Sequence, residues 1–525
     1  MTTKKQFFTT PIYYVNAKPH LGHAYTSIAA DVATRFKQMD EHETFFLTGT
    51  DEHGDKIVQA ARARKKTPKE YADKISMLFQ NLLPILNVKN NAFIRTTDPD
   101  HIKVVKIVLS KIYESGDIYF SSYEGLYCFG CERFYQEREL INGKCPDHGI
   151  EPTVIKESNY FFRMSKYQEW LINHIETNPD FIRPEQYKTE LLSFLKEPLE
   201  DLCISRPKSR LTWGITLPFD ENYVTYVWFD ALVNYISALG YPDGELFKKF
   251  WPETRHFVAK DIIKPHGIYW PIMLKAAGIP IYKGLNVHGF WNVKGNKMSK
   301  SIGNVTDPIK VTDIYGVDPF RYFLMREMVF GLDANFMEET IISRINADLA
   351  NDLGNLFSRV LSMNMRYFKG GVKGSDSIIE QEKNLSLSSN ADHAINEFKK
   401  AMELCEFHKG IGATWQFIST MNKYIDTHKP WDLAKDETNI PVLETLLYNL
   451  IEGLRVVSCL IYPIMPQTSL KMQKILCMEK ENKGFYTLKE ASVWGQVKKN
   501  TLIAKPDSLF PRIDIHKIGP GNQTK

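Results

Sequence analysis

The first 55 residues alternate between strand and helix patterns in a way that strongly limits the fold. The stretch QFFTTPIYY (6–14) is apolar and typical of a buried strand. In HLGHAYTSIAADVATRFKQM (20–39), apolar residues recur at helical spacing. ETFFLTGTDEHG (43–54) then predicts a second strand that ends in a polar loop. Because a strand, a helix and a strand of these lengths form a βαβ unit, we expect an α/β fold with a doubly wound parallel sheet.

Later changes of pattern predict the domain organisation. A cysteine cluster and a mixed segment interrupt the α/β pattern, which returns with TRHFVAKDII and LNVHGFWNV. Long helical periods such as LETLLYNLIEGLRVVSCLIY then fill the last third of the chain. We therefore predict the first half of a Rossmann-like nucleotide-binding domain (1–115), an insertion (116–224), the second half (225–335) and a helical bundle (336–525).

Composition excludes some classes of protein. Lys and Arg number 66 against 62 Asp and Glu, and the net charge of +4 permits a nucleic-acid partner without requiring one. No apolar run approaches the roughly 18 residues that span a bilayer, so we expect no membrane segment. The first residues lack a signal core or an amphipathic presequence, which predicts a cytoplasmic protein. Seven mostly scattered cysteines fit a reducing compartment.

Two short motifs are suited to bind phosphate. HLGH places His20 and His23 at the start of a helix, where free N–H groups attract anions. NVKGNKMSKSIGN (292–304) places Lys297 and Lys300 on a loop between glycines, which predicts a lid that closes over a triphosphate. Either motif alone is weak, because capping histidines or a solvated surface turn would explain it equally well.

Together, in this order on an α/β chain, the two motifs resemble the signature of class I aminoacyl-tRNA synthetases. The stretches TTPIYYVNAKPHLGHAYT, GTDEHG, YVWFDALVNYI, KDIIKPHGIYWP and NADLANDLGNLFSR extend the resemblance to the methionyl-tRNA synthetase family over nearly the whole chain. One departure, Leu21 in place of the family's more usual Ile, is conservative. The resemblance implies that ATP, accompanied by Mg²⁺, is bound by His20, Gly22, His23, Lys297, Ser299 and Lys300.

The resemblance also implies a methionine pocket. It assigns the α-ammonium group to Asp51 and the pocket walls to Ile12, Tyr14, Trp228, Tyr235 and His288. The chemistry agrees, because methionine has a flexible, polarizable thioether and no strong hydrogen-bonding group, so its pocket depends on aromatic walls and shape. From spacing alone, core packing is the simpler interpretation of the two aromatic residues at 228 and 235.

The cysteine cluster CFGCERFYQERELINGKCPDHG has the spacing of a metal site. Cys128 and Cys131 form a CxxC pair, and Cys145 and His148 form a CxxH pair. Four ligands of this kind suit tetrahedral zinc and leave no open coordination position. The sequence therefore predicts one structural Zn²⁺.

In the helical region, Asn355 and Arg359 stand one turn apart, and Trp431 follows a proline. The residues by themselves favour a surface polar pair and a core tryptophan. The resemblance instead implies that all three bind the anticodon, with Asp348 as a weaker candidate for the same surface.

The resemblance thus implies an enzyme that activates L-methionine with ATP to methionyl-adenylate. The methionyl group would then pass to the 3′ end of initiator and elongator tRNA(Met). A monomer is expected, because the appended dimerisation domain of some relatives is missing from this sequence. The alternatives are a synthetase for another amino acid, a small-molecule adenylyltransferase, and a non-catalytic tRNA-binding paralogue.

Overall fold

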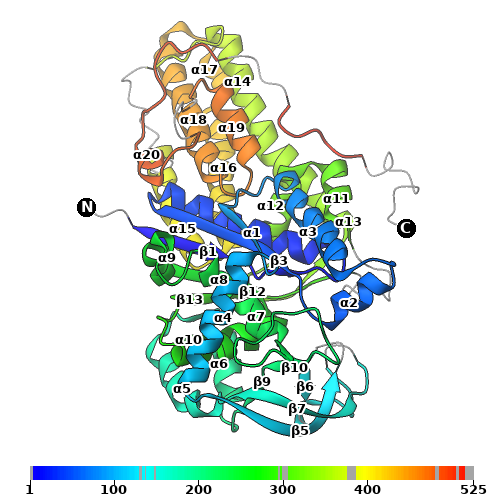
Figure 1. Cartoon of the computed structure of the whole chain (residues 1–525). Coiled ribbons are helices and arrows are strands. Elements are labelled where there is room, and N and C mark those ends of the chain that lie inside the picture. Colours follow the sequence, from blue (N-terminus) through cyan, green and yellow to red (C-terminus); the bar gives the residue numbers. More distant parts are fainter. Residues whose placement is uncertain are drawn as a thin grey trace. The chain divides into compact units, whose positions relative to one another are not determined.

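In the computed structural model of the protein, the strands at the start of the chain belong to a seven-stranded sheet (Figure 1). In spatial order its strands are β2 (Tyr13–Tyr14), β3 (Glu43–Asp51), β1 (Lys5–Thr9), β12 (Thr254–Ala259), β13 (Gly284–His288) and β8 (Ile182–Arg183), and β4 (Ala92–Arg95) pairs with β3. Strands β1, β12, β13 and β8 pair in parallel, as do β2, β3 and β4. The predicted doubly wound parallel sheet is confirmed.

Two details of this sheet differ from the sequence prediction. The expected single strand over residues 6–14 is two strands, because Pro11 lies between them and lacks the N–H that a continuous ladder needs. Strand β8 lies inside the range predicted as an insertion, yet it pairs with β13 of the main sheet. The main sheet therefore takes one strand from that range.

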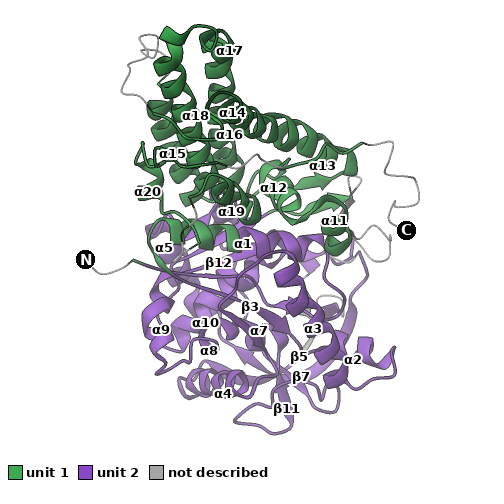
Figure 2. Ribbon diagram, turned by 90° about the horizontal axis from the view of Figure 1, so that it is seen from above, with its two compact units in different colours: residues 1–4, 31–43, 289–525 green, residues 5–30, 44–288 purple. Residues whose placement is uncertain are grey.

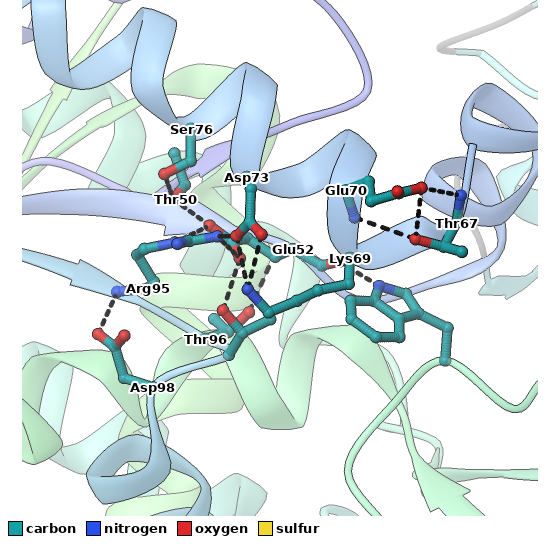
Figure 3. A network of polar contacts seen from close by, with 12 residues as sticks. Thr50, Glu52, Thr67, Lys69, Glu70, Asp73, Ser76, Arg95, Thr96 and Asp98 are labelled. Carbon is teal, nitrogen blue, oxygen red and sulfur yellow. Dashed lines mark hydrogen bonds and ion pairs between the residues drawn. The ribbon is translucent and has the colours of Figure 1, made fainter. Parts of the chain in front are cut away.

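Two helices of the first 85 residues show how local sequence patterns determine helix formation. In α1 (Leu21–Met39) every residue of the predicted apolar stripe is buried. Helix α3 (Pro68–Ile85) begins with a capping box, in which the Thr67 side chain accepts from the Glu70 N–H and the Glu70 carboxylate accepts from the Thr67 N–H (Figure 3). The other helices up to residue 276 are α2 (Asp55–Arg62), α4 (Pro99–Glu114), α5 (Gln168–Thr177), α6 (Glu185–Phe194), α7 (Val227–Leu232), α8 (Asn234–Ser237), α9 (Glu245–Phe250) and α10 (Trp270–Ala276).

An antiparallel sheet lies in the range of the predicted insertion. Its order is β6 (Arg133–Tyr135), β5 (Ile118–Cys128), β7 (Thr153–Phe162) and β9 (Leu202–Cys203). A two-stranded ribbon of β10 (Ser205–Pro207) and β11 (Tyr223–Thr225) follows it in the chain. The change from parallel to antiparallel pairing agrees with the change of pattern in the sequence.

The chain divides into two units (Figure 2). Unit 1 holds residues 1–4, 31–43 and 289–525, and unit 2 holds residues 5–30 and 44–288. The residues that the structure describes are 4–128, 133–135, 137–146, 149–293, 296–297, 306–374, 386–478, 480, 484–503 and 508–514. Over these ranges, no helix combines the length and the apolar character that crossing a membrane requires.

Beyond residue 289, a small sheet precedes a long helical region. The sheet consists of β15 (Asn296–Lys297), β14 (Trp291–Val293) and β16 (Ala334–Phe336). The helices are α11 (Pro308–Tyr315), α12 (Val317–Glu327), α13 (Glu338–Arg344), the π-helical segment η6 (Ile345–Gly354), α14 (Asn355–Phe368), α15 (Leu387–Glu403), α16 (Phe407–His428), α17 (Pro430–Leu433), α18 (Ile440–Leu460), α19 (Pro466–Ile475) and α20 (Leu488–Ser492). Helix α18 is buried along most of its length. The predicted C-terminal helical region is confirmed.

Candidate functional site

The carboxyl edge of the parallel sheet carries several of the predicted site residues. Tyr14 ends β2 and Asp51 ends β3, and the two are register partners. His288 ends β13 opposite Ala259, the last residue of β12. Doubly wound sheets bind ligands outside the carboxyl ends of their strands, near the point where the strand order reverses. That point lies between β1 and β12, so these strand ends are well placed for a ligand.

The two histidines of HLGH lie together at the start of α1. The ring centroids of His20 and His23 are 3.8 Å apart. The backbone N–H of His20 donates to Nδ1 of His23 over 3.1 Å, and the N–H of Gly22 donates to Nδ1 of His20 over 3.1 Å. Because each Nδ1 accepts a hydrogen bond, the proton of each neutral ring is on Nε2. Each ring can therefore donate a hydrogen bond from its Nε2–H to a phosphate oxygen.

An aromatic cluster near the sheet contains most of the predicted methionine-pocket walls. Ile12 and Trp228 are half-buried and pack against the core cluster that contains the buried Tyr235. The Tyr235 hydroxyl is 2.7 Å from Nε2 of His266, a residue that sequence reasoning missed. The ring centroids of Trp228 and His266 are 6.2 Å apart, and the rings meet edge-on.

The hydrogen bonds of His266 define its protonation state. Nδ1 lies 2.8 Å from the carbonyl oxygen of Ile262, which can only accept, so Nδ1 carries the proton. Nε2 of the neutral ring then accepts from the Tyr235 hydroxyl. Burial lowers the pKa of His266 to about 4 and also raises the pKa of Tyr235 above its ordinary value. The pair is therefore neutral at physiological pH, which suits a ligand side chain without charge.

His288 has other contacts. Its Nε2 lies 2.9 Å from the hydroxyl of Thr26, and its ring meets that of Tyr25 edge-on at 5.0 Å. Both partners are on α1. The assignment of His288 to the methionine pocket stays a prediction, and His266 has the contacts with Tyr235 and Trp228 that such a residue needs.

The residue after Asp51 is held by a polar network, shown in Figure 3. The buried carboxylate of Glu52 accepts from Nε of Arg95 over 2.7 Å and from Nη2 over 2.8 Å. The hydroxyls of Thr50 and Thr97 donate to the same carboxylate over 2.7 Å each. Bidentate pairing with a guanidinium fixes the geometry of a carboxylate. The main chain next to Asp51 is therefore held in one position.

Only part of the second phosphate motif lies within the described residues. The backbone of Lys297 lies in β15, where it is the register partner of Asn292 in β14. Ser299 and Lys300 lie outside the described residues. Their roles in ATP binding stay predictions.

Two of the four predicted zinc ligands can be located. Cys128 ends β5, and both Cys128 and Cys145 are buried in a small cluster with Tyr135. The Gly149 N–H donates to the Cys145 carbonyl oxygen over 2.8 Å, which forms a tight turn. Cys131 and His148 lie outside the described residues. Within the described ranges alone, no three His, Cys, Asp or Glu side chains form a metal-binding group.

Two of the three predicted anticodon residues are in contact. The Arg359 guanidinium carbon lies 5.5 Å from the centre of the Trp431 ring, and Nη2 of Arg359 donates to Asp426 over 2.9 Å. Trp431 is 40% exposed, so the interpretation of this residue as a core tryptophan is wrong. Asn355 begins α14 one turn before Arg359 and is also exposed.

Asp348, the weaker candidate, has internal partners instead. Its carboxylate accepts from the Tyr322 hydroxyl over 2.7 Å and from Nη1 of Arg344 over 3.4 Å. These bonds account for the presence of an aspartate at this position by helix packing alone.

Family models match nearly the whole chain. The model described as "tRNA synthetases class I (M)" matches residues 6–151 and 139–361. The model described as "Anticodon binding domain of methionyl tRNA ligase" matches residues 374–518. The first match covers the parallel sheet and the start of the helical region, and the second covers most of the remaining helices.

Individual proteins are similar over the same length. A methionine–tRNA ligase of Caldanaerobacter subterraneus is 46% identical over 98% of this chain and 80% of its own length, and that of Bacillus subtilis is 42% identical over 97% and 78%. The solved structure of Mycobacterium tuberculosis methionyl-tRNA synthetase in complex with methionyl-adenylate is 39% identical, with a TM-score of 0.92 over 97% of this chain and 100% of that one. The chain therefore belongs to the methionyl-tRNA ligases, the methionine-specific family of class I tRNA synthetases.

Proposed function

We propose that this chain activates L-methionine with ATP and transfers the methionyl group to initiator and elongator tRNA(Met). In the first step the methionine carboxylate attacks the α-phosphorus of ATP, and pyrophosphate leaves. In the second, a hydroxyl of the terminal ribose attacks the carbonyl carbon of methionyl-adenylate, and AMP leaves. The observation that carries the proposal is the likeness over 97% of the chain to a synthetase solved with methionyl-adenylate.

The side chain of methionine would lie against the aromatic cluster. Ile12, Trp228 and Tyr235 supply apolar surface, and His266 holds the Tyr235 hydroxyl through a hydrogen bond. Tyr14, at the edge of the sheet beside Asp51, and His288 complete the proposed set. The Asp51 carboxylate would pair with the α-ammonium group. Such a site selects mainly by shape, because a methylene difference in an apolar pocket is worth only about 1–3 kcal/mol.

ATP would bind with its phosphates at the start of α1. The Nε2–H groups of His20 and His23 would donate to phosphate oxygens, and Gly22, which lacks a side chain, would allow close approach. Lys297, Ser299 and Lys300 would stabilise charge on the leaving pyrophosphate, and Mg²⁺ would arrive with ATP. No side chain acts as a covalent nucleophile, so catalysis consists of positioning and charge stabilisation.

A structural zinc would hold the cysteine-rich loops of the insertion. The buried thiols of Cys128 and Cys145 lie in one cluster, which fits two ligands from separate knuckles, and Cys131 and His148 would complete the site. We expect one zinc per chain by elemental analysis of purified protein. A value near zero or two would contradict this ligand set.

The helical bundle would bind the anticodon through Asn355, Arg359 and Trp431. An exposed indole beside a guanidinium offers the flat faces on which unpaired bases stack. In this proposal residues 1–115 and 225–335 form the catalytic domain, 116–224 the insertion and 336–525 the anticodon domain.

One experiment tests the activity against all the alternatives. In ATP–pyrophosphate exchange with each of the twenty amino acids, exchange should depend on methionine. Dependence on another amino acid would indicate a different synthetase, and exchange that depends on an added acceptor other than an amino acid would indicate an adenylyltransferase. A protein that binds tRNA but exchanges nothing would be the non-catalytic paralogue.

A further inference from the structure

The short loop between β3 and α2 is held at two consecutive residues. The first is Glu52, whose carboxylate is fixed by Arg95 (Figure 3). The second is His53, whose Nδ1 lies 2.6 Å from Oδ2 of Asp230. Asp51, the proposed partner of the α-ammonium group, directly precedes both residues. Its position therefore depends on what holds the loop.

Asp230 connects this loop to two helices. Its Oδ1 accepts from Nε2 of His101 in α4 over 2.8 Å. Nδ1 of His101 lies 2.8 Å from the hydroxyl of Ser237 in α8. His53, Asp230 and His101 are all buried, so water does not compete for these bonds. A buried, satisfied network of this kind defines a single arrangement of the groups that it joins.

The helices concerned carry the proposed pocket walls. Asp230 lies in the six-residue helix α7, two residues after Trp228. Ser237 lies in α8, two residues after Tyr235. The network thus joins the loop of Asp51 to the two short helices that carry these aromatic residues.

The electrostatics of Asp230 agree with this role. Burial alone would raise the pKa of its carboxyl, but the charge and hydrogen bonds of His53 and His101 outweigh burial and lower it below its ordinary value. The carboxylate is therefore present throughout the physiological range and accepts from both imidazoles at once.

We propose that Asp230 is a positioning residue of the methionine site, which sets the distance between the Asp51 carboxylate and the aromatic walls at Trp228 and Tyr235. The proposal rests on the methionine site described above. An amino acid is held at both its ammonium group and its side chain, so that distance selects the length of the side chain. Loss of Asp230 should weaken methionine binding and also reduce discrimination against ethionine, which is one methylene longer.

Asp230→Asn tests this, because it keeps the shape of the side chain and removes its charge. In pyrophosphate exchange we expect the KM for methionine to rise about tenfold or more, with the KM for ATP within about twofold of wild type. The preference in kcat/KM for methionine over ethionine should fall by about fivefold. A methionine KM and a preference both within about twofold of wild type would overturn the proposal, as would equal increases in both KM values.

Asp117→Asn is the matched control. Asp117 is also buried, and its carboxylate accepts from Lys166 over 2.7 Å and from Tyr167 over 2.5 Å. It has no proposed link to methionine, so its variant should keep the wild-type ratio of the two KM values. If this control shifts the ratio as Asp230→Asn does, the effect is general and the proposal fails.

A second pair of variants decides the matter if Asp230→Asn does not fold. His53→Ala removes the donor to Asp230, whereas His53→Asn keeps an N–H near the position of Nδ1. We expect the methionine KM to rise in the first and to return to within about threefold of wild type in the second. Two equally impaired variants, or two normal ones, would contradict the proposal. Failure of the wild-type protein to exchange with methionine would instead contradict the proposed function.

Discussion

The proposed methionine site of unit 2 and the Arg359–Trp431 pair of unit 1 both place an aromatic ring beside a polar group, but they differ in their exposure to water. Tyr235 and His266 are buried and satisfy each other's hydrogen bonds. Trp431 is 40% exposed, and its partner Arg359 is paired with the exposed Asp426. The first arrangement suits a small apolar ligand that must leave water. The second suits a base that an RNA loop presents from water.

The charges of the two regions differ for the same reason. Burial keeps both members of the Tyr235–His266 pair neutral near pH 7. Arg359 instead carries a guanidinium, a group with several N–H donors that can bind base edges. Substitutions in the two regions should therefore affect different steps and respond differently to pH.

The largest effect is expected from Lys300→Ala. If this lysine contacts the phosphates mainly in the transition state, kcat for pyrophosphate exchange should fall about 10²–10³-fold, or roughly 3–4 kcal/mol, with little change in the KM for methionine. Charging of tRNA should fall with it, since both activities need the adenylate.

The exposed Lys310 of α11 provides a control for the loss of one positive charge from the same part of the chain. Lys310→Ala should exchange at nearly the wild-type rate. Exchange by Lys300→Ala within about threefold of wild type would remove this lysine from the proposed lid.

A smaller effect is expected in the pH dependence of stability, from the buried Tyr235–His266 pair. The folded pKa of His266 is about 4 and its ordinary value is 6.5, so between these values the unfolded state binds more protons and stability falls as the pH falls. From pH 6.5 to about 4.5, this one group should cost the wild type about 2 kcal/mol. Urea unfolding of His266→Gln should show a correspondingly weaker pH dependence. An identical pH dependence in the two proteins would mean that His266 titrates normally.

The sequence predicted the parts of this molecule that depend on local patterns. The buried stripe of α1 follows from 3.6-residue spacing, and the geometry of His20 and His23 follows from their place at a helix start. His266 was missed because one histidine in an apolar stretch has no spacing signal. Its role depends on Tyr235, which is 31 residues away in the sequence.

Long-range polar pairs explain the other gaps. Glu52 and Arg95 are 43 residues apart, and His53 and Asp230 are 177 apart. Each looks like an ordinary charged or polar residue until the fold brings it to its partner. Strand β8 was also beyond prediction, because two residues are too short to show alternation.

The smallest of the three effects, and the sharpest test of the comparison, is expected from Trp431→Ala. Stacking of a base on an aromatic ring is worth about 1–3 kcal/mol, so charging of tRNA(Met) should fall by at least about fivefold. Pyrophosphate exchange should stay near wild type, because it does not use the anticodon. The exposed ring predicts little change in melting temperature, which is the readout that separates this role from a structural one. Trp494→Ala, at a half-buried tryptophan of the same unit, controls for the loss of an indole and should charge tRNA normally. Normal charging by a stable Trp431→Ala protein would end the anticodon assignment, and equal loss of both activities would show that the two regions are not independent.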